Sequence, residues 1–267
     1  YRVRQLLSGQ WRFPEIRLTR PSIVLIHDDA GWRIANLLRP RRNDSPNAQP
    51  VELPSLVVEQ GTVVIEDATA TPGGPRLPAR VDALDGDFGL TLSRGLTDLV
   101  IRRATFEASQ PALRVAELSG HWTAQDARHD VRDLRVRTAA SLLDASVAYR
   151  PPAAPDQGGQ SQRASIAGKA TTAPFDLAEF AELVPALEGR PLVLSGTADI
   201  NGPLDALAVK ATLADPQAGG VDADVTLALG DPAKRITGRG TTTPAHPSQV
   251  SPVPEPPAQA VEPLVEG

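Results

Sequence analysis

The 267-residue sequence contains no cysteine and no methionine, and aromatic residues make up only 4% of it. The absence of cysteine excludes disulfides and thiol chemistry. No apolar run approaches the roughly 18–20 residues that a helix needs to span a bilayer. The apolar side chains are mainly those of Leu, Val, Ile and Ala, which suit thin β-layers better than a bulky globular core.

Catalytic and metal-binding patterns are also lacking. The four histidines are His27, His121, His129 and His246. His121, Asp126 and His129 could gather around a metal ion, but the gap between the two histidines is not a helical ligand spacing. The sequence has no phosphate-binding glycine loop, no serine elbow and no HExxH motif. We therefore expect no enzyme, no metal site and no cofactor, and a structural or surface role for these histidines.

Charge is unevenly distributed around a net value of −5. Residues 1–42 are rich in arginine, whereas the last residues of the chain carry only acidic charges. The arginines alternate with apolar residues and have no aromatic interleaving for base stacking. This pattern predicts a solvated strand face rather than a nucleic-acid site.

Short segments that alternate apolar and polar residues recur along most of the chain. The clearest covers residues 221–229, which predicts a strand with one apolar and one polar face. We expect tight turns at Asp28–Gly31, Gln60-Gly61 and Asp85-Gly86. The other strands are expected at 16–19, 23–27, 32–37, 56–59, 62–67, 80–84, 88–92, 192–200 and 207–213.

Two composition changes and one helical pattern divide the chain. Residues 1–150 form a first β segment, and the Pro- and Gly-rich residues 151–163 are expected to be a flexible linker. Residues 164–240 continue the β pattern, with one short helix expected over 176–187, capped by Asp176 and ended by Pro185 and Gly189. Residues 241–267 are Pro-rich and aperiodic, which predicts a disordered tail.

Residues 8–67 resemble the AsmA-like superfamily of Gram-negative envelope proteins, which includes the TamB and YhdP relatives. The matching features are 9–13, the proline-to-strand step over 16–25, the acidic–x–Gly–Trp strand at 29–37, and the strand pair at 53–67. Residues 113–148, with Ser119-Gly120 and a Leu-x-Val-x-Thr strand at 134–138, resemble the TamB-type pattern. Residues 175–187 followed by 192–209 resemble its helix, strand and Gly-Pro-Leu unit, so the likeness covers roughly residues 8–240.

The resemblance implies an all-β fold: an elongated, twisted, largely antiparallel sheet curled into an apolar groove, the shape described as a β-taco. It also implies a periplasmic segment of a protein anchored in the inner membrane. The chain begins with Tyr1 and lacks methionine, so we expect a piece of a longer protein whose anchor lies outside it. The implied function is phospholipid transport and outer-membrane biogenesis, with acyl chains as the ligand. The family supplies no catalytic residues.

A groove that keeps acyl chains dry needs an unbroken apolar lining, because exposing one methylene costs about 0.8 kcal/mol. An ordinary β-sandwich would need the same alternation, so the residues alone leave both folds open. Two further functions stay open: an assembly factor that templates outer-membrane barrel strands at its sheet edges, and a carbohydrate-binding or adhesin domain, which would need aromatic platforms. The candidate lining residues are Phe88, Leu90, Leu92, Leu134, Val136, Leu192, Leu194, Ile200, Leu207, Val209, Leu213, Val225, Leu227 and Leu229.

Overall fold

The computed structural model describes residues 15–28, 31–32, 51–67, 76–93, 95–152, 163–228 and 236–244. Several predictions from the sequence fall outside these ranges: the motif at 9–13, most of the strand at 32–37, most of the linker at 151–163, and the tail beyond Pro244. The expected turn at Asp28–Gly31 is only partly described.

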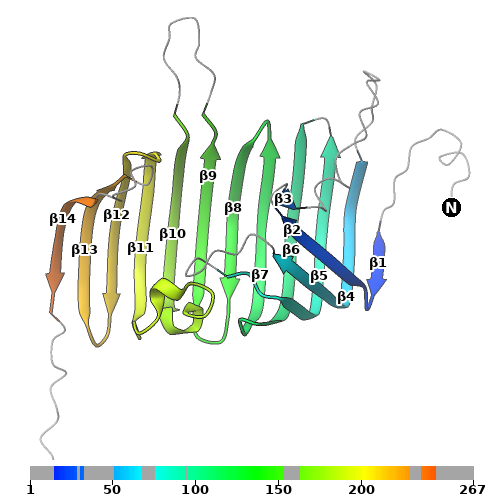
Figure 1. Cartoon of the computed structure of the whole chain (residues 1–267), viewed down its shortest axis with the longest axis horizontal. Coiled ribbons are helices and arrows are strands. Elements are labelled where there is room, and N and C mark those ends of the chain that lie inside the picture. The colour runs from blue at the N-terminus through cyan, green and yellow to red at the C-terminus, as the bar shows by residue number, and fades with distance from the viewer. Residues whose placement is uncertain are drawn as a thin grey trace, which may run out of the picture.

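The described strands belong to one 14-stranded sheet (Figure 1). Its order is β14-β13-β12-β11-β10-β9-β8-β7-β6-β5-β4-β2-β3, and β1 also pairs with β4. The strands are β1 (Ile16–Thr19), β2 (Ser22–Asp28), β3 (Gly31–Trp32), β4 (Val51–Asp67), β5 (Arg80–Ser93), β6 (Leu96–Ser109), β7 (Leu113–Gln125), β8 (Arg128–Arg137), β9 (Leu142–Arg150), β10 (Ser165–Asp176), β11 (Val193–Pro203), β12 (Leu207–Asp215), β13 (Gly219–Leu227) and β14 (Ile236–Thr243).

Neighbouring strands from β4 to β14 pair antiparallel, while β1 and β2 run parallel to β4. Short turns make the antiparallel order possible. Between β7 and β8, Asp126 and Ala127 both have positive φ (47° and 62°), the backbone of the type I′ turn that suits the twist of a hairpin. The prediction of an all-β, largely antiparallel fold is therefore confirmed, and the sheet is open rather than closed into a barrel.

Two predicted hairpins are wrong. Gln60-Gly61 does not separate two strands but lies inside β4, and Asp85-Gly86 lies inside β5. Gln60 has φ 54°, and the pairing of β4 with β5 shifts register on both sides of Gly61. Gln60-Gly61 thus lies at a bulge, which bends a strand without ending it. Asp85 and Gly86 pair regularly with Thr105 and Ala104, next to a register shift between Asp82 and Asp85.

The predicted helix over 176–187 is also wrong. Two short 3-10 turns occupy the segment, η1 (Leu177–Phe180) and η2 (Pro185–Leu187). Asp176 does cap η1, accepting the backbone N–H of Ala178 at 2.9 Å. Pro185 lacks an amide proton and restricts the residue before it, so Val184 (φ −127°, ψ 88°) leaves the helical region and an α-helix cannot continue.

The predicted start of the tail, at residue 241, is too early, because β14 continues to Thr243. The sheet is a single layer, so the described strands do not form the two-sheet sandwich that the sequence left open. Its buried apolar side chains are few: Val58, Ala104, Ala108, Val115 and Leu207. Within the described ranges, no helix has the length and apolar character needed to cross a membrane.

Candidate functional site

The strand registers gather apolar side chains on one face of the sheet, which we call the apolar face. Directly opposed residues on paired strands share a face, so each ladder of partners is a row that crosses the sheet. One row connects β1 to β13 through a chain of opposed partners. Its members are Leu18, Val58, Gly86, Ala104, Leu118, Val136, Leu143, Thr172, Gly196, Leu213 and Val221.

Twelve of the fourteen candidate lining residues fall on this face by the same registers. Leu192 precedes β11 and lies outside the paired registers, with its carbonyl accepting the N–H of Leu177 at 3.0 Å. Leu229 lies outside the described residues. The candidate residues that lie in paired strands therefore share one face, and their role as a groove lining stays a prediction.

The side chains in the middle of the apolar face change in size along the sheet. From β9 to β14 one row consists only of small residues, and we call it the central row: Ala145, Ala170, Ala198, Ala211, Ala223 and Gly240. The rows on either side carry larger residues such as Leu213 and Val209. Toward β1 the same position holds Leu134, Ile101, Phe88, Leu56 and Ile16.

On the opposite, polar face, ion pairs connect neighbouring strands. Arg135 and Asp144 face each other across β8 and β9 at 2.7 Å, and this hydrogen-bonded contact lowers the pKa of Asp144. Similar pairs join other strands: Glu117–Arg137 at 3.1 Å, Lys169–Asp199 at 3.4 Å and Lys210–Asp224 at 3.6 Å. Each exposed pair of this kind contributes little to stability. Together the pairs keep this face hydrated and favour the observed strand register.

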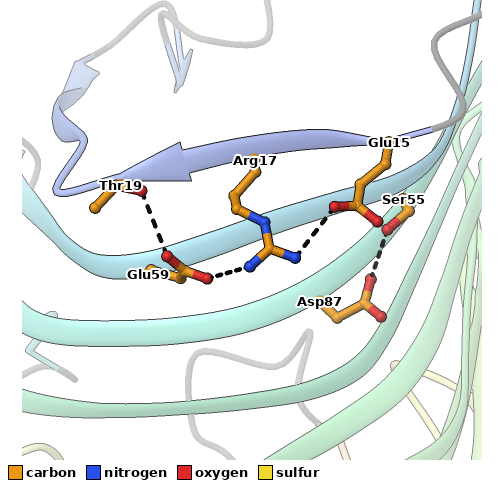
Figure 2. A network of polar contacts seen from close by, with 6 residues as sticks. All are labelled: Glu15, Arg17, Thr19, Ser55, Glu59 and Asp87. Carbon is orange, nitrogen blue, oxygen red and sulfur yellow. Dashed lines mark hydrogen bonds and ion pairs between the residues drawn. The ribbon is translucent and has the colours of Figure 1, made fainter.

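The same chemistry attaches β1 to β4, as Figure 2 shows. Arg17 lies between Glu59 at 2.6 Å and Glu15 at 3.2 Å, and Thr19 donates to Glu59 at 3.4 Å. On β4 and β5, Ser55 donates to Asp87 at 3.5 Å. The ribbons that carry this network are visibly curved (Figure 2).

Asp215 holds the end of β12 by accepting three backbone N–H groups. They belong to Ala218 at 2.6 Å, Gln217 at 2.7 Å and Val193 at 2.7 Å. These bonds favour the charged form, so the pKa of Asp215 is lowered, most by the Ala218 N–H. The carboxylate thereby fastens the β12–β13 turn to the start of β11.

Three hollows lie on the polar face. The largest, about 800 Å³, extends over β8 to β12 between charged residues such as Lys169, Asp199 and Lys210. The others measure about 510 and 320 Å³ and lie between similar rows of polar side chains.

An aromatic cluster at one rim escaped the sequence reasoning. The ring of His129 stacks on Trp122 (centroids 6.0 Å apart, 6° between planes) and lies 6.2 Å from Tyr149. All three share the apolar face, at the ends of β7, β8 and β9. The two-residue turn at Asp126 predicts the first contact, but the second depends on the pairing of β8 with β9.

Three of the four histidines lie in the described strands, and the structural or surface role expected for His121 and His129 stays a prediction. His121 contacts Asp98 at 2.9 Å on the polar face, and His27 contacts Asp67 at 3.0 Å. His121 and His129 lie on opposite faces and cannot share a metal ion. Within the described part of the chain, no group of three His, Asp or Glu side chains is placed to hold one.

No protein-family model, no curated protein and no solved structure matches the chain.

Proposed function

We propose that this chain is a non-enzymatic lipid-binding segment that holds phospholipid acyl chains along its apolar face. The observation that carries the proposal is the continuous register of apolar side chains across the sheet. The face bears no charged side chain among the members of its rows from β1 to β13 named above.

The exposure of this face supports a ligand. Val221, on its C-terminal part, is 44% exposed, and Val209 and Val225 are half-buried. Burial of apolar surface contributes about 25 cal/mol per Å², and each methylene removed from water about 0.8 kcal/mol. For a sheet with one hydrated face and one exposed apolar face, the binding free energy is therefore most favourable with a long apolar ligand that covers several strands at once.

The setting of the proposal is the bacterial envelope. A groove formed by this face in the manner of the AsmA-like proteins would make the chain a periplasmic section of an inner-membrane-anchored protein. Its role would be to support phospholipid transport and outer-membrane biogenesis. The resemblance described for residues 8–240 and the single-layer sheet are the two observations that support this setting.

The experiment is native mass spectrometry with lipid extraction on the chain purified from a Gram-negative periplasm. We expect bound phospholipid in the wild type and its loss in Val225→Asp, which places a charge on the apolar face. The matched control is Thr226→Asp, one residue along β13, which places the same charge on the polar face. Equal lipid capture by Val225→Asp and Thr226→Asp would reject the proposal.

A second function rests on the open ends of the sheet. In the described part of the chain, β14 pairs only with β13, so one side of it is available for strand addition. The alternative is thus an assembly factor whose edge binds strands of outer-membrane or secreted β-proteins. Co-purification of a barrel protein that is lost in Thr241→Pro but kept in Val225→Asp would favour it over lipid binding.

A further inference from the structure

The segment that connects β10 to β11 lies over one end of the apolar face. We call residues 177–187 of this segment the strap; they include η1 and η2, whose coiled ribbon lies in front of the lower ends of β10 and β11 in Figure 1. Phe175 is opposed to Leu194 across β10 and β11, so its side chain is on the apolar face. The ring of Phe180, from η1, stacks on that of Phe175 with the centroids 4.6 Å apart and 8° between the planes. A side chain of the strap thus covers part of the apolar face.

The strap also reaches the ends of strands that are not its neighbours in the sheet. The carbonyl oxygen of Leu183 accepts the backbone N–H of Arg76, just before β5, at 2.7 Å. The carboxylate of Glu182 accepts the N–H of Ala112, between β6 and β7, at 3.4 Å. Four strands, β6 to β9, separate β5 from β10 in the sheet order. The strap and the residues before β5 therefore approach each other across the ends of the intervening strands.

These attachments are few compared with those of the sheet. One further bond joins the strap to the β8–β9 turn, where Glu179 accepts the hydroxyl of Thr138. Of the strap side chains whose exposure the structure describes, none is buried, and Phe180 and Leu183 are half-buried. By contrast, ladders of backbone hydrogen bonds hold β10 and β11 on both sides. Short 3-10 turns with few buried contacts open at a lower free energy than the sheet that carries them.

We infer that the strap is a displaceable cover and that a phospholipid acyl chain competes with it for the apolar face at the ends of β10 and β11. This inference rests on the proposed function, to which it adds a means of regulation. Phe180 removes from water the apolar surface of Phe175 that an acyl chain would otherwise cover, so the strap and the lipid exclude each other there. Weakening the strap should therefore increase lipid binding, whereas a charge on the apolar face should decrease it.

The first test replaces Phe180 in the full chain and measures binding of dioleoyl phosphatidylglycerol by native mass spectrometry. Phe180→Ala should lower the apparent Kd about two- to tenfold, the range that the loss of one aromatic pair implies. The control is Phe106→Ala, which removes the same ring from β6, outside the strap, and should not tighten binding.

The second test fixes the strap instead. The chain has no native cysteine, and Ala112 and Glu182 are both exposed, so Ala112→Cys/Glu182→Cys can be joined by a short bismaleimide. The joined protein should bind phosphatidylglycerol severalfold more weakly than the same variant with both cysteines capped by N-ethylmaleimide. Backbone hydrogen exchange of residues 177–187, measured without lipid, should be faster than that of β10 and should slow when the cysteines are joined.

The outcomes distinguish this inference from the proposed function. If neither the wild type nor Phe180→Ala binds phosphatidylglycerol, the proposed function is wrong and the inference falls with it. If the wild type binds the lipid, but Phe180→Ala binds it equally and the joined and capped proteins do not differ, the strap is a fixed part of the fold and only the inference is wrong. Weaker binding by Phe180→Ala, with a circular dichroism spectrum like that of the wild type, would make Phe180 part of the lipid site and would also overturn the inference.

Discussion

The two halves of the sheet use the same apolar face differently. From β4 to β7 the strands have 13 to 17 residues, and their pairings shift register repeatedly. Four of the five buried apolar side chains lie there: Val58, Ala104, Ala108 and Val115. From β11 to β13 the strands have 9 to 11 residues, the pairings among them run without a shift, and only Leu207 is buried.

This contrast indicates which part of the sheet stabilises the fold and which part is available to a ligand. Bulges bend the long strands, so apolar side chains of the first half bury one another. The regular strands of the second half leave most of theirs half-buried, with Val221 44% exposed, and a row of alanines lies between rows of larger residues. We infer that the first half stabilises the fold and that the second half carries the surface for the ligand.

The largest expected effect on stability comes from introducing one carboxylate into each half of the sheet. Val115 is 4% exposed, so Val115→Asp buries an unpaired carboxylate and should lower the free energy of unfolding by about 3–5 kcal/mol. Val209→Asp, on the same face in β12, should lower it by less than about 1 kcal/mol because its carboxylate reaches water. Urea unfolding measures both, and equal losses would contradict the comparison.

A glycine in the second half tests how closely its regular strands approach. Gly196 has φ 149°, and a Cβ there would lie 2.0 Å from the carbonyl oxygen of Thr212. Gly196→Ala should therefore lower the free energy of unfolding by about 2–3 kcal/mol. Gly240→Ala, whose Cβ would lie 3.6 Å from the nearest atom, is the control and should be near neutral in the same unfolding measurement.

Enlarging one alanine in each half sharpens the contrast. Ala104 is 1% exposed, so Ala104→Leu overpacks the first half and should cost about 1–3 kcal/mol. Ala198→Leu fills the central row of the second half, where space is open, and should leave stability unchanged while weakening phospholipid binding. Thermal unfolding and native mass spectrometry read the two effects separately. A large stability loss in Ala198→Leu would mean that the second half is packed too.

The smallest effect concerns the pH dependence that Asp215 gives the second half. Its pKa is lowered in the folded chain, so its stabilisation is full above the unfolded pKa of about 3.9 and is lost as the pH falls through the folded value. Asp215→Asn should lower the Tm at pH 7, and the difference from wild type should narrow progressively as the pH falls below about 4. A Tm difference that persists unchanged at pH 2.5 would contradict this origin.

The sequence predicted most of the residues that share one face of the sheet, but fewer of the points at which strands begin, end or bend. Alternation at Val221, Val225 and Leu227 is a local signal, and every register in β13 agrees with it. Gln60-Gly61 gave a false hairpin because a polar residue followed by glycine suits both a turn and a bulge. Only the long-range pairing of β4 with β5 distinguishes them.

Other features could not be predicted for the same reason. Pro185 was expected to end an α-helix, but it opens the second 3-10 turn, η2, and Val184 before it lies outside the helical region. His129 and Tyr149 are far apart in sequence, and their rings meet only through the pairing of β8 with β9. The central row likewise exists only once five pairings are in register.

The most direct test of the account is photo-crosslinking with a phospholipid that carries a diazirine at the end of an acyl chain. Mass spectrometry of the digested chain then locates the adducts. We expect adducts on the apolar face of the second half, at residues such as Ala198, Val209 and Val225. Adducts concentrated on the polar face, or on the buried side chains around Val115, would contradict it.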